Sequence, residues 1–357
     1  MNHYTGDTDN LYINVQFVGG STGNKYENVH KLMAYNGSTS QVLLSEVKDY
    51  FIGVCTLTIS AHSIPLIKFL DLVDGQSNPN LTIWELTFSY GGNDYSLAVQ
   101  FIPSTSMPAP LGTNYKTSKS PYYDLNNFNQ ICRMLNTTLS SIYNTMFTAN
   151  PAIAGLGLTI NDTPYFIFEN EKFTLVYNKL FVGSGIKLYM NDAIQIKLSG
   201  MDVYFNGVNT DGKDYEIIFI DSKNNEYNAT NYANYQSYTN VQSFQVINQI
   251  IIKSQNLRGR TEVLLSNSNN LLNYGSIIFS LNPLLETQQQ MKSKLTFTTN
   301  GLYRLVDIIG TGTLNNIDVS VYYTDTLGNL YDVQLGPNEV TTLKLGFFKK
   351  PLFSNEW

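Results

Sequence analysis

One stretch matches a catalytic motif by letter. Residues 19–23 read Gly-Gly-Ser-Thr-Gly, the G-x-S-x-G of a nucleophile elbow, in which the serine needs an oxyanion loop, an acid and a later histidine. Only 20 residues precede Ser21, too few for the earlier strands of such a fold, and the only later histidines are His30 and His62. We interpret the glycines as turn residues and do not expect a hydrolase.

A second motif resembles the start of a dinucleotide-binding fingerprint. Gly310-Thr311-Gly312 follows residues 306–309 (Val-Asp-Ile-Ile), as the first glycines of G-x-G-x-x-G follow a strand. Asn315 occupies the position of the third glycine, and no helix or βαβ pattern follows. The stretch is predicted to be a loop.

Residues that bind metals or act as catalytic acids are scattered. Residues 211–214 (Asp-Gly-Lys-Asp) lack the ligand series of a calcium loop and predict a hairpin turn. The carboxylate pairs Glu169/Glu171 and Asp71/Asp74 are not tied to any predicted cleft, and the histidines His3, His30 and His62 do not form zinc-type spacing with the cysteines. The sequence therefore predicts no catalytic, cofactor-binding or metal-ligating residue: we expect no enzyme activity and no cofactor.

The composition indicates a weakly charged surface. Charged residues make up 14% of the 357 residues, against roughly 25% in typical soluble domains, and the chain contains 25 tyrosines and 19 phenylalanines. A neutral, tyrosine-rich surface is typical of proteins that assemble, although an AT-rich genome would produce a similar composition. The net charge of −6 argues against nucleic acid as a partner beyond weak contact; Arg258 and Arg260, near Lys253, are the only basic cluster.

Cysteine usage and hydropathy indicate an intracellular protein. Cys55 and Cys132 both lie in apolar surroundings and are predicted to be buried free thiols. The first ten residues do not resemble a signal peptide, and no window approaches 18 apolar residues. We expect neither secretion nor contact with a membrane.

Apolar residues alternate with polar ones in many short stretches, as in half-buried strands. Gly91-Gly92-Asn93-Asp94 lies between two of these stretches and predicts a tight hairpin. Eight strands, the number in a jelly roll, are predicted at 11–18, 50–59, 81–90, 95–102, 244–253, 276–281, 317–323 and 341–347. Stretches 295–299 and 331–335 are further candidates.

One amphipathic helix is predicted at about 125–147, with Asp124 as its N-cap. Its apolar stripe comprises Phe128, Ile131, Cys132, Leu135, Leu139, Ile142 and Met146. The proline-rich segment 103–121 before it predicts a domain boundary, and the segment 224–240, rich in Asn and Tyr, predicts a long loop and a second boundary.

The resulting fold prediction is an all-β protein. A single eight-stranded jelly roll, discontinuous in sequence, has its first half at 1–110 and its second half at 241–357. Residues 111–240 form an inserted β-rich domain that contains the helix. Within it, hairpins are predicted from 164 to 220, one of them turning at Glu169-Asn170-Glu171.

The C-terminal stretch 303–350 carries a resemblance. It resembles the closing pattern of the minor capsid (penton) proteins of virophages and the related Maverick-type elements. The resemblance rests on Arg304, Asp307, Leu314, Ile317, Asp318, Val321, Tyr322, Asp325, Gly328, Asn329, Leu330, Lys344, Leu345, Phe347, Lys349 and Lys350. Residues 78–92 and the pair Tyr122-Tyr123 are also similar, so that roughly 90 residues take part.

The resemblance implies a structural virion protein. It implies a penton, with the jelly roll in the shell and the insertion facing outward, that forms homopentamers at the five-fold vertices of an icosahedral capsid and contacts the major capsid protein. Such a protein assembles in the host cytoplasm and ends in the virion. The insertion could also contact a host receptor.

Two other functions fit the sequence. The chain could be a two-domain β-sandwich that binds carbohydrate or a receptor through aromatic loops such as residues 231–235 (Asn-Tyr-Ala-Asn-Tyr). It could also be a major capsid protein with two jelly rolls, although two full eight-stranded rolls and their loops would crowd 357 residues.

Overall fold

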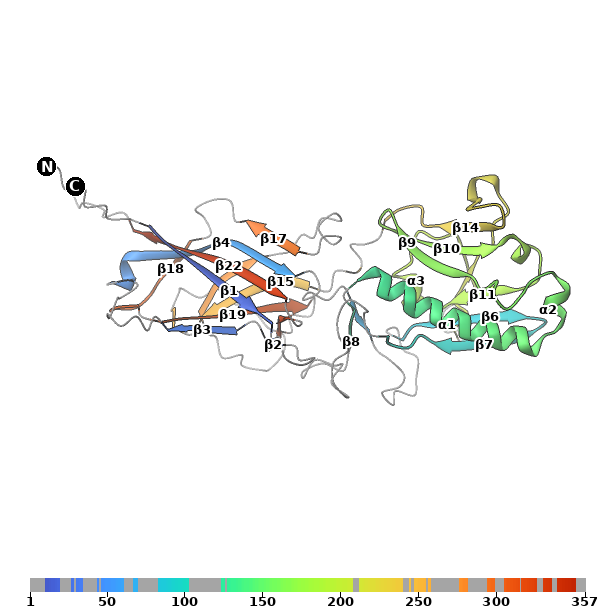
Figure 1. Ribbon diagram of the computed structural model, residues 1–357, viewed down its shortest axis with the longest axis horizontal. Coiled ribbons are helices and arrows are strands. Elements are labelled where there is room, and N and C mark those ends of the chain that lie inside the picture. Colours follow the sequence, from blue (N-terminus) through green and yellow to red (C-terminus); the bar gives the residue numbers. More distant parts are fainter. Residues whose placement is uncertain are drawn as a thin grey trace. The chain divides into compact units, whose positions relative to one another are not determined.

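The computed structural model divides the chain into two units, each described by itself. It describes residues 10–19, 27–28, 30–34, 44, 46–60, 67–69, 83–102, 123–125, 127–207, 212–239, 244, 247–254, 256–257, 276–281, 294–298, 305–314, 316–325, 330–335 and 339–350. Unit 1 consists of residues 1–64 and 246–357, and unit 2 of residues 65–245. In Figure 1, unit 1 therefore carries the blue and red ends of the chain and unit 2 the green and yellow middle.

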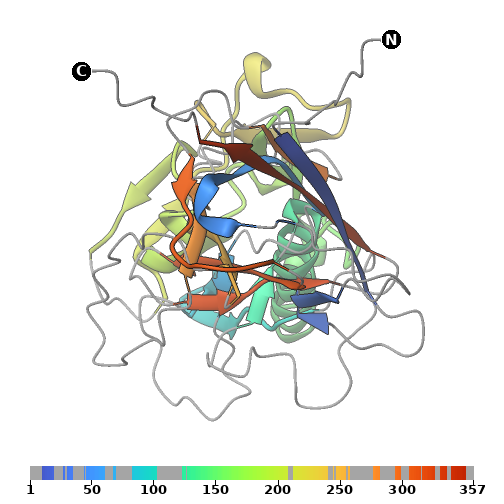
Figure 2. The same ribbon diagram turned by 90° about the vertical axis from the view of Figure 1, so that its left-hand side faces the viewer.

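The first sheet of unit 1 joins strands from both ends of the chain. Its antiparallel order is β1-β22-β4-β17, and β18 also pairs with β4. The strands are β1 (Asn10–Val18), β22 (Val340–Lys349), β4 (Tyr50–Ser60), β17 (Lys294–Thr298) and β18 (Val306–Asp307). β1 and β22 lie side by side in Figure 1 and Figure 2, since every residue of β1 has a partner in β22.

The second sheet of unit 1 is also antiparallel. Its order is β16-β15-β19-β20, with β3 paired to β19, and a separate two-stranded sheet joins β2 to β21. The strands are β16 (Ser276–Leu281), β15 (Ile247–Ser254), β19 (Asn316–Asp325), β20 (Leu330–Asp332), β3 (His30–Ala34), β2 (Glu27–Asn28) and β21 (Gln334–Leu335).

Apolar side chains from both sheets share one core. Leu343 of β22 pairs with Val15 of β1 and with Leu57 of β4, and Ile252 of β15 pairs with Val321 of β19; all five are at most 1% exposed. They belong to one buried cluster of mostly Val, Ile and Leu. Burying such a side chain contributes roughly 1.5–3 kcal/mol. Two antiparallel sheets packed on one apolar core are the architecture of a jelly roll.

Six of the eight predicted strands belong to this sandwich. The other two, 81–90 and 95–102, contain β6 (Glu85–Tyr90) and β7 (Asn93–Ala98), which lie in unit 2 because β6 pairs with β11 (Lys187–Met190). Both further candidates, 295–299 and 331–335, are strands of unit 1. Pairing with a strand 100 residues away cannot be read from the alternation of β6 itself, since every candidate partner alternates in the same way.

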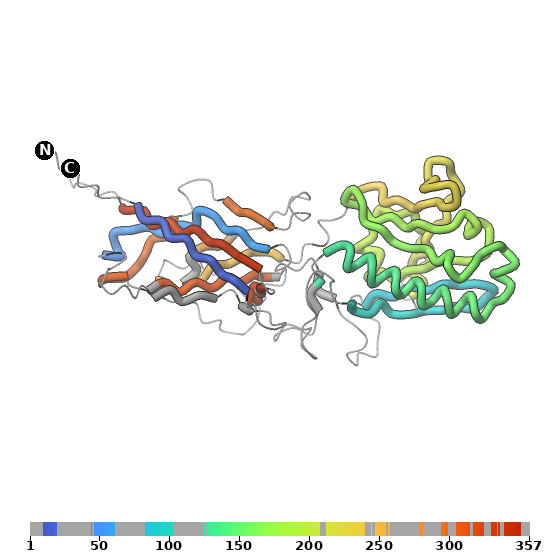
Figure 3. The backbone as a smooth tube through the Cα atoms, in the orientation of Figure 1, coloured from blue at the N-terminus to red at the C-terminus, as the bar shows by residue number. Residues whose placement is uncertain are grey.

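The described part of unit 2 contains two larger sheets, one two-stranded sheet and three α-helices. One sheet has the order β12-β13-β11-β6-β7 and the other β14-β10-β9, while β5 pairs with β8. The additional elements are β12 (Val203–Phe205), β13 (Tyr215–Ile217), β14 (Asn231–Tyr235), β10 (Lys172–Asn178), β9 (Tyr165–Glu169), β5 (Ile67–Phe69), β8 (Tyr123–Leu125), α1 (Phe128–Ala149), α2 (Ala152–Gly155) and α3 (Asp192–Gln195). Helix α1 packs on β9, β6 and β7, and Figure 3 shows it beside these strands.

The predicted helix is confirmed, but its N-cap differs. All seven residues of the predicted stripe are buried in α1. The helix begins at Phe128, capped by the Asn127 side chain, which accepts a hydrogen bond from the Gln130 N–H at 2.7 Å. Asp124 lies in β8 and therefore cannot cap the helix. Asn and Asp are both good N-caps, so residue type does not distinguish Asn127 from Asp124. The pairing of β8 with β5 holds Asp124 in a strand and leaves Asn127 as the cap.

Phenylalanine rings fill one end of the unit 2 core. Phe128 stacks on Phe168 with ring centroids 4.2 Å apart, and Phe244 lies 5.4 Å from Phe128 and 5.7 Å from Phe173. Phe244 is the last described residue before unit 2 ends at Gln245. The aromatic cluster therefore fixes the end of the inserted chain to the start of α1.

Two predicted hairpins of unit 2 have two-residue turns. Gly91 and Gly92 have φ of +60° and +82°, and Asn170 and Glu171 have φ of +51° and +64°. Positive φ at both central residues matches the twist of the flanking strands. Glycine and asparagine tolerate this conformation, whereas Glu171 does so at a cost.

The two units meet at 64/65 and 245/246 in the sequence. The boundaries expected from the sequence were 110/111 and 240/241. The segment 224–240 is not a long loop, because it contains β14, which pairs with β10 and buries Ala233 and Asn234. The proline-rich segment 103–121 lies outside the described residues.

Candidate interaction surfaces

The catalytic motifs are not assembled into a site. Gly19 ends β1 and donates its N–H to the Glu339 carbonyl at 2.9 Å, while Ser21 lies outside the described residues. Gly310 and Gly312 adopt φ of +148° and +111° in a loop, as predicted. Within the described part of the chain, no three His, Cys, Asp or Glu residues are placed to hold a metal ion.

The two cysteines form no disulfide bond, and their thiols are weakly acidic. Burial raises the pKa of Cys132 to about 12, and burial also raises the pKa of Cys55. A thiol is nucleophilic as its thiolate, so neither cysteine is suited to catalysis at neutral pH. Among the residues that the structure describes, no helix is long and apolar enough to span a membrane. The basic candidates Arg258 and Arg260 lie outside those residues.

The acidic turn between β12 and β13 has a structural role. Lys213 Nζ lies 2.5 Å from Asp94 Oδ2, and this contact lowers the pKa of Asp94. Asp214 is buried and accepts a hydrogen bond from the Asp192 N–H at 3.2 Å. Gly212 lies so close to Glu85 that a Cβ would approach its carboxyl carbon to 2.8 Å. These carboxylates fasten the turn to the sheet and do not converge on a ligand.

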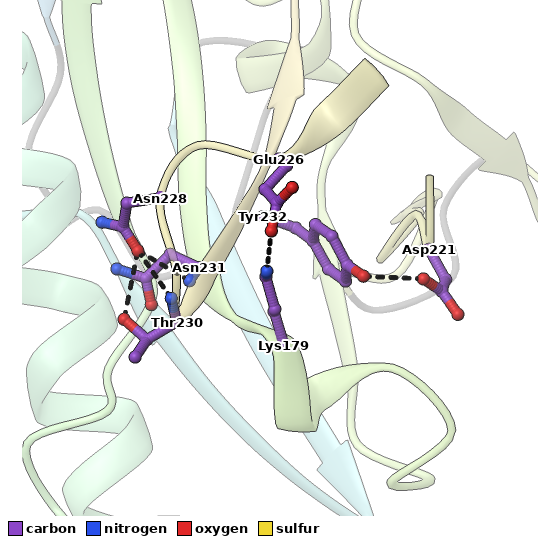
Figure 4. A network of polar contacts seen from close by, with 7 residues as sticks. All are labelled: Lys179, Asp221, Glu226, Asn228, Thr230, Asn231 and Tyr232. Atoms are coloured by element: carbon purple, nitrogen blue, oxygen red, sulfur yellow. Dashed lines mark hydrogen bonds and ion pairs between the residues drawn. The ribbon is translucent and has the colours of Figure 1, made fainter. Parts of the chain in front are cut away.

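A polar network surrounds the start of β14 (Figure 4). Lys179 pairs with Glu226, and its Nζ lies 4.9 Å from the centroid of the Tyr232 ring. The Tyr232 hydroxyl donates to Asp221 Oδ1 at 2.8 Å, and this hydrogen bond raises the pKa of Tyr232. Next to it, Asn228 Oδ1 accepts from the N–H groups of Thr230 and Asn231 at 2.9 and 2.8 Å. The network therefore organises the turn that precedes the strand.

The aromatic stretch 231–235, predicted as a binding loop, is strand β14, and buried amides hold it in place. Asn234 Oδ1 accepts from the Asp202 N–H at 3.1 Å, and its Nδ2 donates to the carbonyls of Asp202 and Ile218. Gln236 Oε1 accepts from the Phe173 N–H at 2.7 Å, and its Nε2 donates to the Ser199 carbonyl. These braces were not predicted from the sequence. The one signal for a buried strand is the short side chains of Ala233 and Asn234 within the Asn-Tyr-Ala-Asn-Tyr stretch.

Exposed aromatic side chains mark one side of unit 2. Tyr204 and Phe205 on β12 are 61% and 60% exposed, more than any other large apolar residue of the described chain. β12 is an edge strand, with β13 on its single paired side. An exposed apolar edge strand is prone to pair with another chain. This edge is a candidate interaction surface.

The opposite side of unit 2 presents an uncharged surface. No Asp, Glu, Lys or Arg occurs from Met134 to Asn161, a range that covers most of α1 and all of α2. Along α1 the exposed positions are Asn129, Thr137, Ser141, Thr145, Thr148 and Ala149. This is the second candidate surface, and neither surface was identified from the sequence.

Comparison with known proteins places the chain among capsid proteins. The family model for the Sputnik minor capsid protein V18/19 matches residues 11–350. The structural protein V19 of Sputnik virophage is 32% identical over 87 residues, which are 24% of this chain and 40% of V19. The uncharacterized protein V18 of the same virus is 27% identical over 117 residues, 31% of this chain and 70% of V18. The match with V19 thus spans less than half of that relative.

Two solved structures share the fold. A chain in the 3.5 Å cryo-EM structure of the Sputnik virophage matches with a TM-score of 0.70 at 21% identity, covering 96% of this chain and 99% of that one. The crystal structure of the mavirus penton protein matches with a TM-score of 0.60 at 15% identity, covering 95% and 99%. The predicted resemblance, jelly-roll fold and structural role in a virion are confirmed. Since the family model spans almost the whole sequence, this chain belongs to the Sputnik minor capsid protein V18/19 family.

Proposed function

We propose that the chain is the penton subunit of a small icosahedral virion. Five copies would form a ring at each five-fold vertex, and the ring would contact the major capsid protein around its rim. The observation that carries the proposal is the likeness of fold to the mavirus penton protein, over nearly the full length of both chains.

The division of the chain supports the same assignment. Unit 1 is a complete sandwich whose first and last strands pair with each other, so a domain can be inserted between its halves without breaking its core. We assign unit 1 to the shell and unit 2 to the outward-facing insertion. A ring of this kind uses one head-to-tail contact repeated until it closes.

The mass and symmetry of the purified protein test the proposal. Since one chain is 40.2 kDa, five chains would give about 200 kDa by light scattering, with five-fold class averages in the electron microscope. If the protein is monomeric alone, the same measurements are made with the major capsid protein added. A chain that remains monomeric in both conditions, or closes with another symmetry, contradicts the proposal.

Receptor or carbohydrate binding by unit 2 has less support. It was predicted from an aromatic loop at 231–235, but two of those residues are buried in β14 and the Tyr232 hydroxyl is bonded to Asp221. A glycan array probed with the whole protein would detect such binding directly.

A further inference from the structure

We propose that neighbouring copies in the ring meet through the two opposite sides of unit 2. The Tyr204–Phe205 edge of one copy would pack on the uncharged surface of the next, formed by α1 and α2. This inference rests on the proposed ring of subunits and names the contact that unit 2 makes within it.

The two surfaces lie on opposite sides of the same fold. β12 and β7 are the two edges of one five-stranded sheet. On the β7 side, α1 packs against both β7 and β9, and Asn150 Nδ2 donates to the Tyr95 hydroxyl at 2.8 Å. On the β12 side, Asn234 of β14 bonds to Asp202, which precedes β12. A head-to-tail ring needs two different surfaces on opposite sides of each subunit, and unit 2 has them.

The exposed hydroxyls of α1 are suited to lose water at little cost. Thr137 Oγ1 donates to the Arg133 carbonyl at 2.9 Å, Thr145 to the Ser141 carbonyl at 3.0 Å, and Thr148 to the Asn144 carbonyl at 2.8 Å. Burying a polar group costs little when its hydrogen bond is already made within the protein. Short side chains also lose little conformational freedom on being covered.

Exposed apolar groups also occur next to this surface. Leu97 on β7 is 38% exposed, and Leu156 and Ile160 beyond α2 are 37% and 46% exposed. Leu180, 45% exposed, lies against Gly157, where a Cβ would be 3.3 Å from its Cδ1. The surface therefore combines uncharged hydroxyls with apolar groups, which suits the rings of Tyr204 and Phe205.

The net charge of unit 2 favours a second copy of this chain as the partner that binds the uncharged surface. Unit 2 carries 15 Asp and Glu against 10 Lys and Arg, so it holds −5 of the total charge of −6. Placing five such units around one axis brings like charges together, which is costly. A contact through the stretch without charged residues keeps the acidic side chains of one copy away from those of the next.

A charge placed on α1 tests the contact. Thr145→Glu adds one negative charge at an exposed position and improves helix propensity. Thr145→Gln introduces a side chain of nearly the same shape as glutamate but without the charge. Ala229→Glu adds the same charge at an exposed position on neither surface. Phe205→Glu tests the opposite side. Light scattering over a dilution series gives the concentration at which each ring dissociates, and circular dichroism confirms that each variant folds.

We expect Thr145→Glu and Phe205→Glu each to raise the dissociation concentration at least tenfold, and Thr145→Gln and Ala229→Glu to change it less than threefold. If the wild type forms rings and all four variants match it, the contact is overturned while the penton proposal stands. If Ala229→Glu weakens the ring as much as Thr145→Glu, general repulsion explains the effect and the contact is overturned. If the wild type forms no ring, with or without the major capsid protein, both proposals fail.

Discussion

The two units of the chain bury their cores by different means. Unit 1 packs long strands, such as the ten-residue β19 and β22, around a core of Val, Ile and Leu. Several strands of unit 2 are only three residues long, and its core depends on phenylalanine rings and buried amides. Long strands satisfy the backbone through their own ladders, whereas short strands leave backbone groups that side chains must bond. We therefore expect unit 1 to respond mainly to changes in packing and unit 2 also to the loss of single polar side chains.

The largest effect is expected from the aromatic cluster of unit 2. Phe173→Ala removes a 2%-exposed ring that contacts Phe128, Phe168 and Phe244. Such a truncation lowers the free energy of unfolding by about 3–5 kcal/mol. Denaturant unfolding followed by hydrogen exchange would show the loss in unit 2 peptides. Equal loss of protection in unit 1 would contradict the separation of the units. Tyr235→Ala, at an exposed ring of β14, is the matched control, with a change within about 0.5 kcal/mol.

The buried amide brace should rank second. Asn234→Ala removes three hydrogen bonds to the backbone of residues 202 and 218. Since buried groups left without partners cost about 1–3 kcal/mol each, we expect a loss of about 3 kcal/mol in unit 2. Asn224→Ala, at an exposed position, should change the same unfolding curve by less than about 0.5 kcal/mol. Equal changes in the free energy of unfolding for both variants would show that the buried hydrogen bonds of Asn234 do not stabilise unit 2.

In unit 1 the corresponding prediction concerns a close approach within β22. A Cβ at Gly346 would lie 2.7 Å from Cε2 of the Phe348 ring and 2.9 Å from Cys55 Sγ. Gly346→Ala should therefore cost about 1–3 kcal/mol through overpacking. The double variant Gly346→Ala with Phe348→Ala should be less destabilised than the sum of the two single variants. Strict additivity in chemical denaturation would show that the ring is not the obstacle.

Alkaline pH should weaken unit 2. Burial raises the pKa of Tyr177 to about 12 from its usual 10, so the folded state holds this proton more tightly than the unfolded state. The stability is fully present below pH 10 and is lost as the pH rises towards 12, by on the order of 1–2 kcal/mol. Tyr177→Phe should flatten this decline in a pH series of unfolding curves. An unchanged slope would assign the decline to other groups.

The smallest effect, and a stabilising one, is expected at the hairpin between β9 and β10. Glu171 has φ of +64°, a conformation that costs a residue with a Cβ roughly 1 kcal/mol. Glu171→Gly should raise the stability of unit 2 by about that amount, whereas Glu171→Ala should bring no gain. The melting temperatures of the wild type and the two variants test this. An equal rise in melting temperature for Glu171→Ala would attribute the gain to the lost charge and not to the backbone conformation.

The sequence by itself determined the elements whose signals are local. The apolar stripe of α1 repeats at helical spacing, the Gly91-Gly92 turn requires positive φ, and the alternation in β1 and β22 selects the buried face. Each signal lies within a few residues and reflects the geometry of one element.

Only the tertiary structure decided which elements belong together. It placed β6 beside β11 in unit 2, made β14 a strand through its pairing with β10, and chose Asn127 over Asp124 as the helix cap. It also left Tyr204 and Phe205 exposed on an edge strand, where their types alone would suggest burial. The physical reason is that strand pairing and burial depend on partners distant in the chain, and many partners satisfy the same local pattern.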